Sequence, residues 1–145
     1  ATDLALTADG ETRPAQFWPL ATWPDGSVKW AGVAVPASPF AAASITVGDN
    51  PAPESPVSVG DADDAVTVDN GLLTLVVPRR GSALFSSLSR RGTVVAENGR
   101  LVSALADGPS SRDARTDLAG VTDTVTVEQT GPVRAVIRVD GHHAA

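Results

Sequence analysis

Residues 23–30 read Trp-Pro-Asp-Gly-Ser-Val-Lys-Trp, and this stretch holds two of the three tryptophans and the only lysine of the chain. Pro24 fixes φ at the first central position of a turn, and Gly26 can adopt a left-handed conformation without a steric clash. Apolar and aromatic residues lie on both sides, at 16–20 and at 28–31. We therefore expect a β-hairpin whose turn lies at residues 24–26.

The composition around this hairpin is that of a globular protein made of short strands. The 145 residues are 42% hydrophobic, 19% charged and only 4% aromatic. Small and β-branched side chains favour short strands with tight turns over aromatic-packed helices. No segment longer than one turn keeps an apolar period of 3.6 residues. The sequence therefore predicts an all-β fold.

Charge and missing residue types exclude several classes of function. The net charge of −6 disfavours nucleic acids and anionic membranes as partners. No apolar run approaches the roughly 20 residues that a membrane-spanning helix needs. The absence of cysteine excludes disulfides, thiolate metal sites and a cysteine nucleophile. The sequence also has no methionine, and we expect it to be part of a longer chain.

A proline-rich and acidic stretch divides the sequence into two parts. Three prolines lie close together at 51, 53 and 56, and Asp61, Asp63 and Asp64 follow them. Proline at this density stiffens and extends a connection, and the carboxylates keep it solvated. We predict one β unit at residues 1–50, a linker at 51–64 and a second β unit at 65–145.

Within these units the sequence predicts two further hairpins, a bulge and a loop. Asp69-Asn70-Gly71 supplies strong turn chemistry between strands at 66–68 and 72–77, and a second hairpin turns at 130–132. Gly32 is placed to form a β-bulge, since Val33 and Val35 lie on the opposite parity from Val28 and Trp30. The polar residues 103–120 are predicted to be an irregular loop.

Five segments resemble one known family: 15–16, 23–30, 69–71, 128–135 and 139–142. In order, they are similar to the N-terminal RIFT-type barrel of exo-acting rhamnogalacturonan lyases and to the β-sandwich that follows it. The resemblance implies a small RIFT-like β-barrel, with its start missing, followed by a partial antiparallel β-sandwich. A truncated sandwich should expose an unpaired strand edge and be prone to self-association.

What this resemblance implies about function is an accessory role. The catalytic centre of the family is expected in a large α/α-toroid domain further along the chain, and the parent protein is expected to be extracellular or periplasmic. The chain has no tyrosine to act as a base in β-elimination, and we expect no catalytic residue and no cofactor here. Its partners would be the downstream catalytic domain and an acidic polysaccharide. The alternatives are a carbohydrate-binding module with an aromatic face and a structural or oligomerisation domain without ligand.

The candidate binding residues are Trp18, Trp23, Lys29 and Trp30. Indole faces pack against the C–H faces of sugar rings, and the lysine could bind a uronate carboxylate. With so few aromatics in the chain, packing of the tryptophans in the barrel or between domains is the favoured interpretation. Exposed indoles would favour the binding module, whereas buried indoles would favour a scaffold.

No metal site is predicted. Asp61, Asp63 and Asp64 have the spacing of a calcium loop only in part, because Val66 stands where such a loop requires glycine. His142 and His143 are sequence neighbours, so on a strand they point to opposite faces. We also find no pair of carboxylates that the sequence singles out for glycoside hydrolysis.

Overall fold

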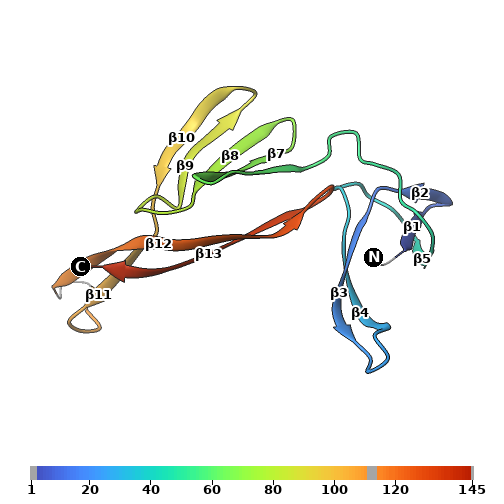
Figure 1. Cartoon of the computed structure of the whole chain (residues 1–145), viewed down its shortest axis with the longest axis horizontal. Coiled ribbons are helices and arrows are strands. Elements are labelled where there is room, and N and C mark those ends of the chain that lie inside the picture. The colour runs from blue at the N-terminus through green and yellow to red at the C-terminus, as the bar shows by residue number, and fades with distance from the viewer. Residues whose placement is uncertain (1–2, 111–113, 145) are drawn as a thin grey trace. The chain divides into compact units, whose positions relative to one another are not determined.

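The computed structural model describes residues 3–110 and 114–144, and every regular element in these ranges is a β-strand (Figure 1). All strand pairs are antiparallel. The all-β prediction is therefore confirmed. The chain forms two compact units, one made of Ala1–Val57 together with Gly131–Arg134, the other of Ser58–Thr130 together with Ala135–Ala145.

The first unit contains two small sheets. The order β2-β1-β5 makes a three-stranded sheet, and β3-β4 is a separate hairpin. The strands are β1 (Leu4–Ala8), β2 (Glu11–Arg13), β3 (Gln16–Thr22), β4 (Val28–Ala34) and β5 (Ala43–Val47).

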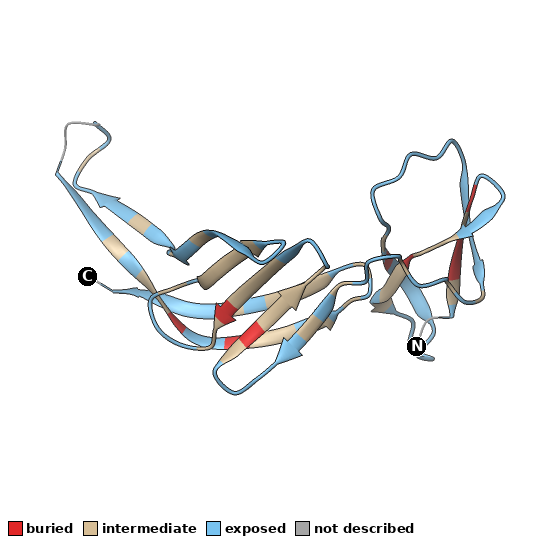
Figure 2. Cartoon of the chain, turned by 90° about the horizontal axis from the view of Figure 1, so that it is seen from above, coloured by how far each residue is buried: buried red, intermediate tan, exposed pale blue. Residues whose placement is uncertain are grey.

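Small side chains form the buried part of this unit. Its buried apolar residues are Ala5, Leu6, Ala8 and Ala15 (Figure 2). Asn50 fixes the end of the sheet, because Leu6 N–H donates to Asn50 Oδ1 (3.0 Å) and Asn50 Nδ2 donates to the Leu4 carbonyl (2.5 Å). These two bonds tie β1 to the residues that follow β5.

The second unit is a two-layer arrangement with a compact valine core. One sheet has the order β10-β9-β8-β7-β6 and the other has the order β11-β12-β13. The strands are β6 (Ser58–Asp61), β7 (Ala65–Asp69), β8 (Leu73–Pro78), β9 (Phe85–Arg90), β10 (Thr93–Gly99), β11 (Val102–Ala106), β12 (Arg115–Thr130) and β13 (Ala135–Ala144).

The core joins the two sheets of this unit. Val66 and Val77 are directly opposite each other on β7 and β8, and both pack with Val125 of β12. Partly buried apolar side chains surround them, among them Val59 of β6 and Ile137 of β13. Burial on one face and exposure on the other follow from the two-residue period of a strand. The predicted sandwich is thus present.

Two segments differ from the sequence prediction. Residues 58–61, assigned to the linker, form the end strand β6, because Val59 packs against the core while its neighbours stay exposed. Residues 103–120, predicted to be an irregular loop, contribute to β11 and to the start of β12, which pair from Val102↔Ala119 to Ala106↔Arg115. β11 and residues 115–119 of β12 are largely solvent-exposed, so hydrophobic periodicity gave no signal for them.

The predicted turns are confirmed, and the predicted bulge is not. Gly26 and Gly71 have φ of 85° and 79°, the left-handed values expected of turn glycines. The register of β3 with β4 shifts at Leu20 and at Lys29, whereas Gly32 pairs regularly with Trp18. The bulge prediction at Gly32 was therefore wrong, and the reason that this position is glycine lies in the packing of Trp18 described below.

Candidate functional site

The turn between β3 and β4 is held by its own polar groups. Gly26 N–H donates to the Trp23 carbonyl (2.9 Å) and Trp23 N–H donates to the Ser27 carbonyl (2.8 Å). The Asp25 carboxylate accepts from the Ser27 hydroxyl (2.6 Å) and from the Ser27 N–H (2.9 Å). The hydroxyl bond is the main cause of a lowered pKa of Asp25, and the N–H bond adds to it. The turn is therefore closed by hydrogen bonds and carries the negative charge of Asp25 at its tip.

Lys29 lies at a bulge, where it can reach back toward the turn. Trp30 pairs with Ala21 and Val28 with Thr22, so Lys29 is the inserted residue of β4. Its Nζ lies 4.4 Å from the centroid of the Trp23 ring, a cation–π distance. One face of Trp23 is consequently occupied by a side chain of the same hairpin.

Trp18 packs against two other parts of the first unit. A Cβ built on Gly32 would lie 2.3 Å from a Trp18 ring carbon, so the indole rests directly on the Gly32 backbone. The guanidinium carbon of Arg134 lies 4.8 Å from the centroid of the Trp18 ring. Gln16 holds the segment that contains Arg134, because Gln16 Oε1 accepts hydrogen bonds from the N–H groups of Val133 (3.0 Å) and Arg134 (2.8 Å).

The three tryptophans thus divide into one half-buried and two exposed side chains. Trp23 is 51% exposed and Trp30 is 64% exposed, whereas Trp18 is half-buried. Leu20, the inserted residue of β3, is 65% exposed beside them. The hairpin therefore presents Trp23, Lys29 and Trp30 to solvent, while Trp18 stabilises the first unit.

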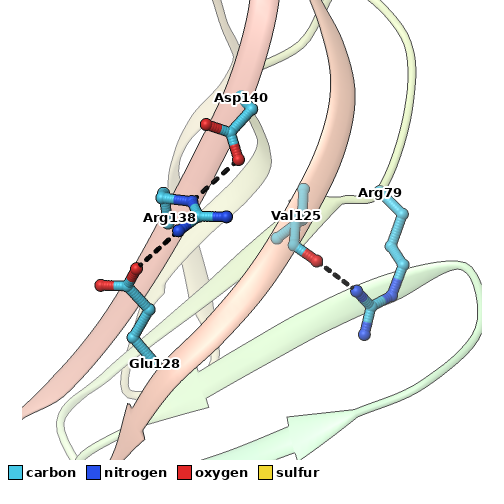
Figure 3. Close-up of polar contacts among 5 residues, drawn as sticks. All are labelled: Arg79, Val125, Glu128, Arg138 and Asp140. Atoms are coloured by element: carbon cyan, nitrogen blue, oxygen red, sulfur yellow. Dashed lines mark hydrogen bonds and ion pairs between the residues drawn. The ribbon is translucent and has the colours of Figure 1, made fainter.

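In the second unit Arg79 joins the two sheets (Figure 3). Its Nη1 donates to the Val125 carbonyl (2.6 Å), the bond that Figure 3 draws. Its Nε donates to the Ala62 carbonyl (2.8 Å). Its Nη2 forms an ion pair with Asp61. Since Val125 lies on β12 and the other two acceptors lie at the β6–β7 connection, one side chain connects both layers. Asp61, read from sequence as a solvated linker residue, is thus part of a structural contact.

A second ion-pair cluster lies on β13 (Figure 3). Arg138 Nε contacts Asp140 Oδ2 at 2.9 Å, and Arg138 Nη1 contacts Glu128 Oε1 at 3.2 Å. The hydrogen bond to Asp140, followed by the charges of Asp140 and Glu128, raises the pKa of Arg138. All three side chains are more than 40% exposed, so the cluster contributes little to stability in water.

The two histidines border a shallow pocket of about 160 Å³ that is lined by residues of β12 and β13 together with Ser82, Leu84 and Leu101. His142 Nδ1 lies 2.9 Å from Asp123 Oδ2, and His143 Nε2 lies 2.8 Å from Ser103 Oγ. Each imidazole therefore has a different partner. In residues 3–110 and 114–144 no three histidine or acidic side chains come together in a way that could hold a metal ion.

Besides Asp25 and Arg138, Asp69 also has a shifted pKa. Asp69 lies at the turn between β7 and β8. The Thr74 hydroxyl, and then the Gly71 N–H, donate to its carboxylate and lower its pKa. This is a turn-stabilising contact, not an acid–base pair. The same ranges contain no helix with the length and hydropathy that a bilayer crossing requires.

Sequence reasoning missed Gln16, Arg79 and Arg134. Their hydrogen-bond and ring partners lie 46 to 118 positions away along the chain, except for the Asp61 and Ala62 contacts of Arg79. No local pattern indicates such partners. The one available signal was that Gln16 and Arg134 both fall within segments that carry the family resemblance.

Comparison with known proteins gives two family matches and one relative. Residues 1–50 match the PcRGLX-like N-terminal RIFT barrel domain, and residues 57–145 match the PcRGLX-like protein central beta sandwich domain. The uncharacterized protein YetA of Bacillus subtilis (strain 168) is 32% identical over 145 residues. That alignment covers 95% of this chain and 17% of the relative, so the chain spans about a sixth of the relative's length.

Proposed function

Since the chain belongs to the family of PcRGLX-like proteins, we propose that it forms the non-catalytic accessory β-domains of a polysaccharide lyase-like protein of the exo-rhamnogalacturonan lyase type. The observation that carries the proposal is the pair of adjacent family matches, which together cover nearly the whole chain. In this role the two units pack against a catalytic domain and shape it, in an extracellular or periplasmic protein.

Two further observations support an accessory role. The relative is several times longer than this chain, which leaves room for other domains in a protein of that kind. The shifted carboxylates, Asp25 and Asp69, accept hydrogen bonds from neighbours in their own turns and have no basic side chain among the causes of their shifts. A catalytic acid or base is typically perturbed by burial together with a charged partner in a cleft.

The chain alone should not cleave rhamnogalacturonan, because it lacks tyrosine and because the two carboxylates with a shifted pKa, Asp25 and Asp69, owe the shift to hydrogen bonds within their own turns. The measurement is the ultraviolet absorbance of unsaturated uronate ends released over time. A longer protein that contains this chain serves as the positive control. Metal-free turnover by the chain alone, abolished by one point substitution within it, would contradict the proposal.

Carbohydrate binding is a second candidate, favoured by the exposure of Trp23 and Trp30 at the hairpin. Exposed indoles can stack on sugar rings, and the Lys29 ammonium beside them would attract a uronate carboxylate. Because Lys29 covers one face of Trp23, a sugar would have to use Trp30 and the opposite face of Trp23.

If this candidate is correct, Trp30→Ala should weaken binding of a polygalacturonate oligosaccharide about tenfold, as expected for loss of one aromatic platform. Lys29→Ala should weaken binding of the acidic oligosaccharide and leave a neutral one unaffected. Titration calorimetry measures both. Phe40→Ala is the matched control, since Phe40 is also an exposed aromatic of the first unit. Equal affinities of the Trp30 and Phe40 variants would exclude the hairpin as a sugar site.

A further inference from the structure

Building on the candidate sugar-binding role of the β3–β4 hairpin, we propose that one face of this hairpin binds an acidic oligosaccharide of several sugars (Figure 1). Lys29 and Arg134 are the two residues that bind its carboxylates. The face carries all three tryptophans of the chain, and each of the two cations lies over one of these indoles.

The register of the hairpin places the three tryptophans on one face. Trp18 is opposite Gly32, and Trp30 lies two residues from Gly32 on β4, so Trp18 and Trp30 share a face. Ala21 is opposite Trp30, and Trp23 lies two residues after Ala21, where its N–H still donates across the hairpin. Trp23 therefore lies on the same face as the other two indoles.

The inserted residue Leu20 makes this alignment possible. Trp18 and Trp23 are five positions apart, so on a regular strand they would point to opposite faces. The bulge at Leu20 shifts the alternation by one residue and brings both indoles to the same side. Lys29, the inserted residue of β4, lies at the same end of the hairpin, and its ammonium reaches the Trp23 ring. Bulges commonly redirect side chains next to functional sites.

Both cations lack an acidic partner on the protein. Neither Lys29 nor the guanidinium of Arg134 makes an ion pair or a side-chain hydrogen bond with any residue of 3–110 and 114–144, and both side chains are exposed. Arg13, the other cation of the first unit, is bound to Glu11. The Asp25 carboxylate accepts hydrogen bonds within its own turn instead. In a chain with a net charge of −6, two such cations are placed to receive an anion from solution.

Arg134 is oriented for a planar anion. Its backbone N–H donates to Gln16 Oε1 (2.8 Å), and its guanidinium carbon lies 4.8 Å from the centroid of the Trp18 ring. Stacking on an indole occupies one face of a guanidinium and leaves the N–H groups at its edge free to form two parallel bonds. A carboxylate is the group of an acidic sugar that matches this fork.

The spacing of the two cations requires a chain of sugars. Trp18 and Trp23 are five residues apart along β3, so at about 3.3 Å per residue their backbones are separated by about 15 Å. Trp30, which is 64% exposed, lies between them on the same face. One sugar ring cannot bridge this distance. An oligosaccharide with carboxylates on separate rings can do so while an intervening ring stacks on Trp30.

Ligand length distinguishes Arg134 from the rest of the site. Arg134→Gln should weaken binding of a galacturonate hexasaccharide about tenfold, as expected for loss of a charge-assisted pair with a carboxylate. The same variant should bind a galacturonate disaccharide as tightly as the unaltered chain does, because the disaccharide stacks on the exposed indoles beside Lys29. Titration calorimetry at low salt measures both affinities. An unchanged disaccharide affinity also shows that the variant hairpin remains folded.

Arg80→Gln is the matched control, because Arg80 is also an exposed arginine without an ion pair to any described residue, but belongs to the second unit. It should leave both affinities unchanged. If Arg134→Gln matched Arg80→Gln on the hexasaccharide while Trp30→Ala still weakened binding, the extended acidic site would be wrong and the sugar-binding candidate would stand. A hexasaccharide that does not bind at all would overturn both. A glutamate hexapeptide that bound as tightly, with the same loss in Arg134→Gln, would overturn the assignment to a sugar.

Discussion

Arg79→Met is expected to lower the free energy of unfolding of the second unit by about 3 kcal/mol. The substitution removes hydrogen bonds to the carbonyls of Ala62 and Val125 and the ion pair with Asp61. Each bond from a charged donor contributes about 1.5–3 kcal/mol, and partial exposure of Arg79 reduces the sum. The Val125 carbonyl, next to the valine core, then loses its donor. Chemical denaturation should show a lower midpoint with an unchanged slope.

Two variants make this result specific. Arg80→Met changes an exposed neighbour that makes no ion pair or side-chain hydrogen bond with any described residue, and it should leave the midpoint within experimental error. Asp61→Asn keeps both carbonyl bonds and should cost only about 0–1 kcal/mol, since the Asp61 carboxylate is more than half exposed. If Arg79→Met matched Asp61→Asn, solvent would be replacing the carbonyl bonds without loss.

Gly131→Ala is expected to destabilise the first unit by about 3 kcal/mol. Gly131 has a φ of 104°, which alanine adopts only with strain, and the new Cβ would lie 2.3 Å from the Val57 carbonyl oxygen. The adjoining bond from Val57 N–H to the Pro132 carbonyl (2.7 Å) holds the two segments together, so neither can withdraw easily. Tryptophan fluorescence during denaturation would report the change, because Trp18 packs on the segment that contains Arg134.

Gly26→Ala is the control for backbone strain alone. Gly26 also has positive φ, 85°, but its Cβ would meet no atom within 4 Å. A loss of about 1 kcal/mol is expected there. The difference between the two variants therefore measures the contact with Val57. Equal losses of stability in the two variants would mean that the turn at 131–134 shifts enough to accommodate the new Cβ beside Val57.

The sequence predicted what local chemistry determines. The turn at 24–26 followed from Pro24 and Gly26, and the hairpin at 69–71 from its Asp-Asn-Gly chemistry, because these residues fix the backbone without distant help. The all-β class followed from composition and from the absence of a helical period. The barrel and the sandwich themselves came from resemblance, and the family matches agree with it.

What the sequence did not predict depends on distant partners or lies outside the core. Trp18 and Trp30 look alike in sequence, yet one is packed by Gly32 and Arg134 while the other is exposed. β11 buries too little to leave an apolar pattern. Arg79 resembles Arg80 next to it, and only the position of the Val125 carbonyl distinguishes their roles. Pairing and packing between remote segments decide such differences.

The segment 131–134, which completes the first unit, has a consequence for how the protein is made. A ribosome delivers the chain from its N-terminus, so residues 1–57 emerge long before the N–H groups of Val133 and Arg134 that bind Gln16. Until then Trp18 has its contact with Gly32 but not the one with Arg134. The first unit to be synthesised is thus finished only after nearly all of the second has emerged, and the nascent chain must keep its early strands from wrong partners meanwhile.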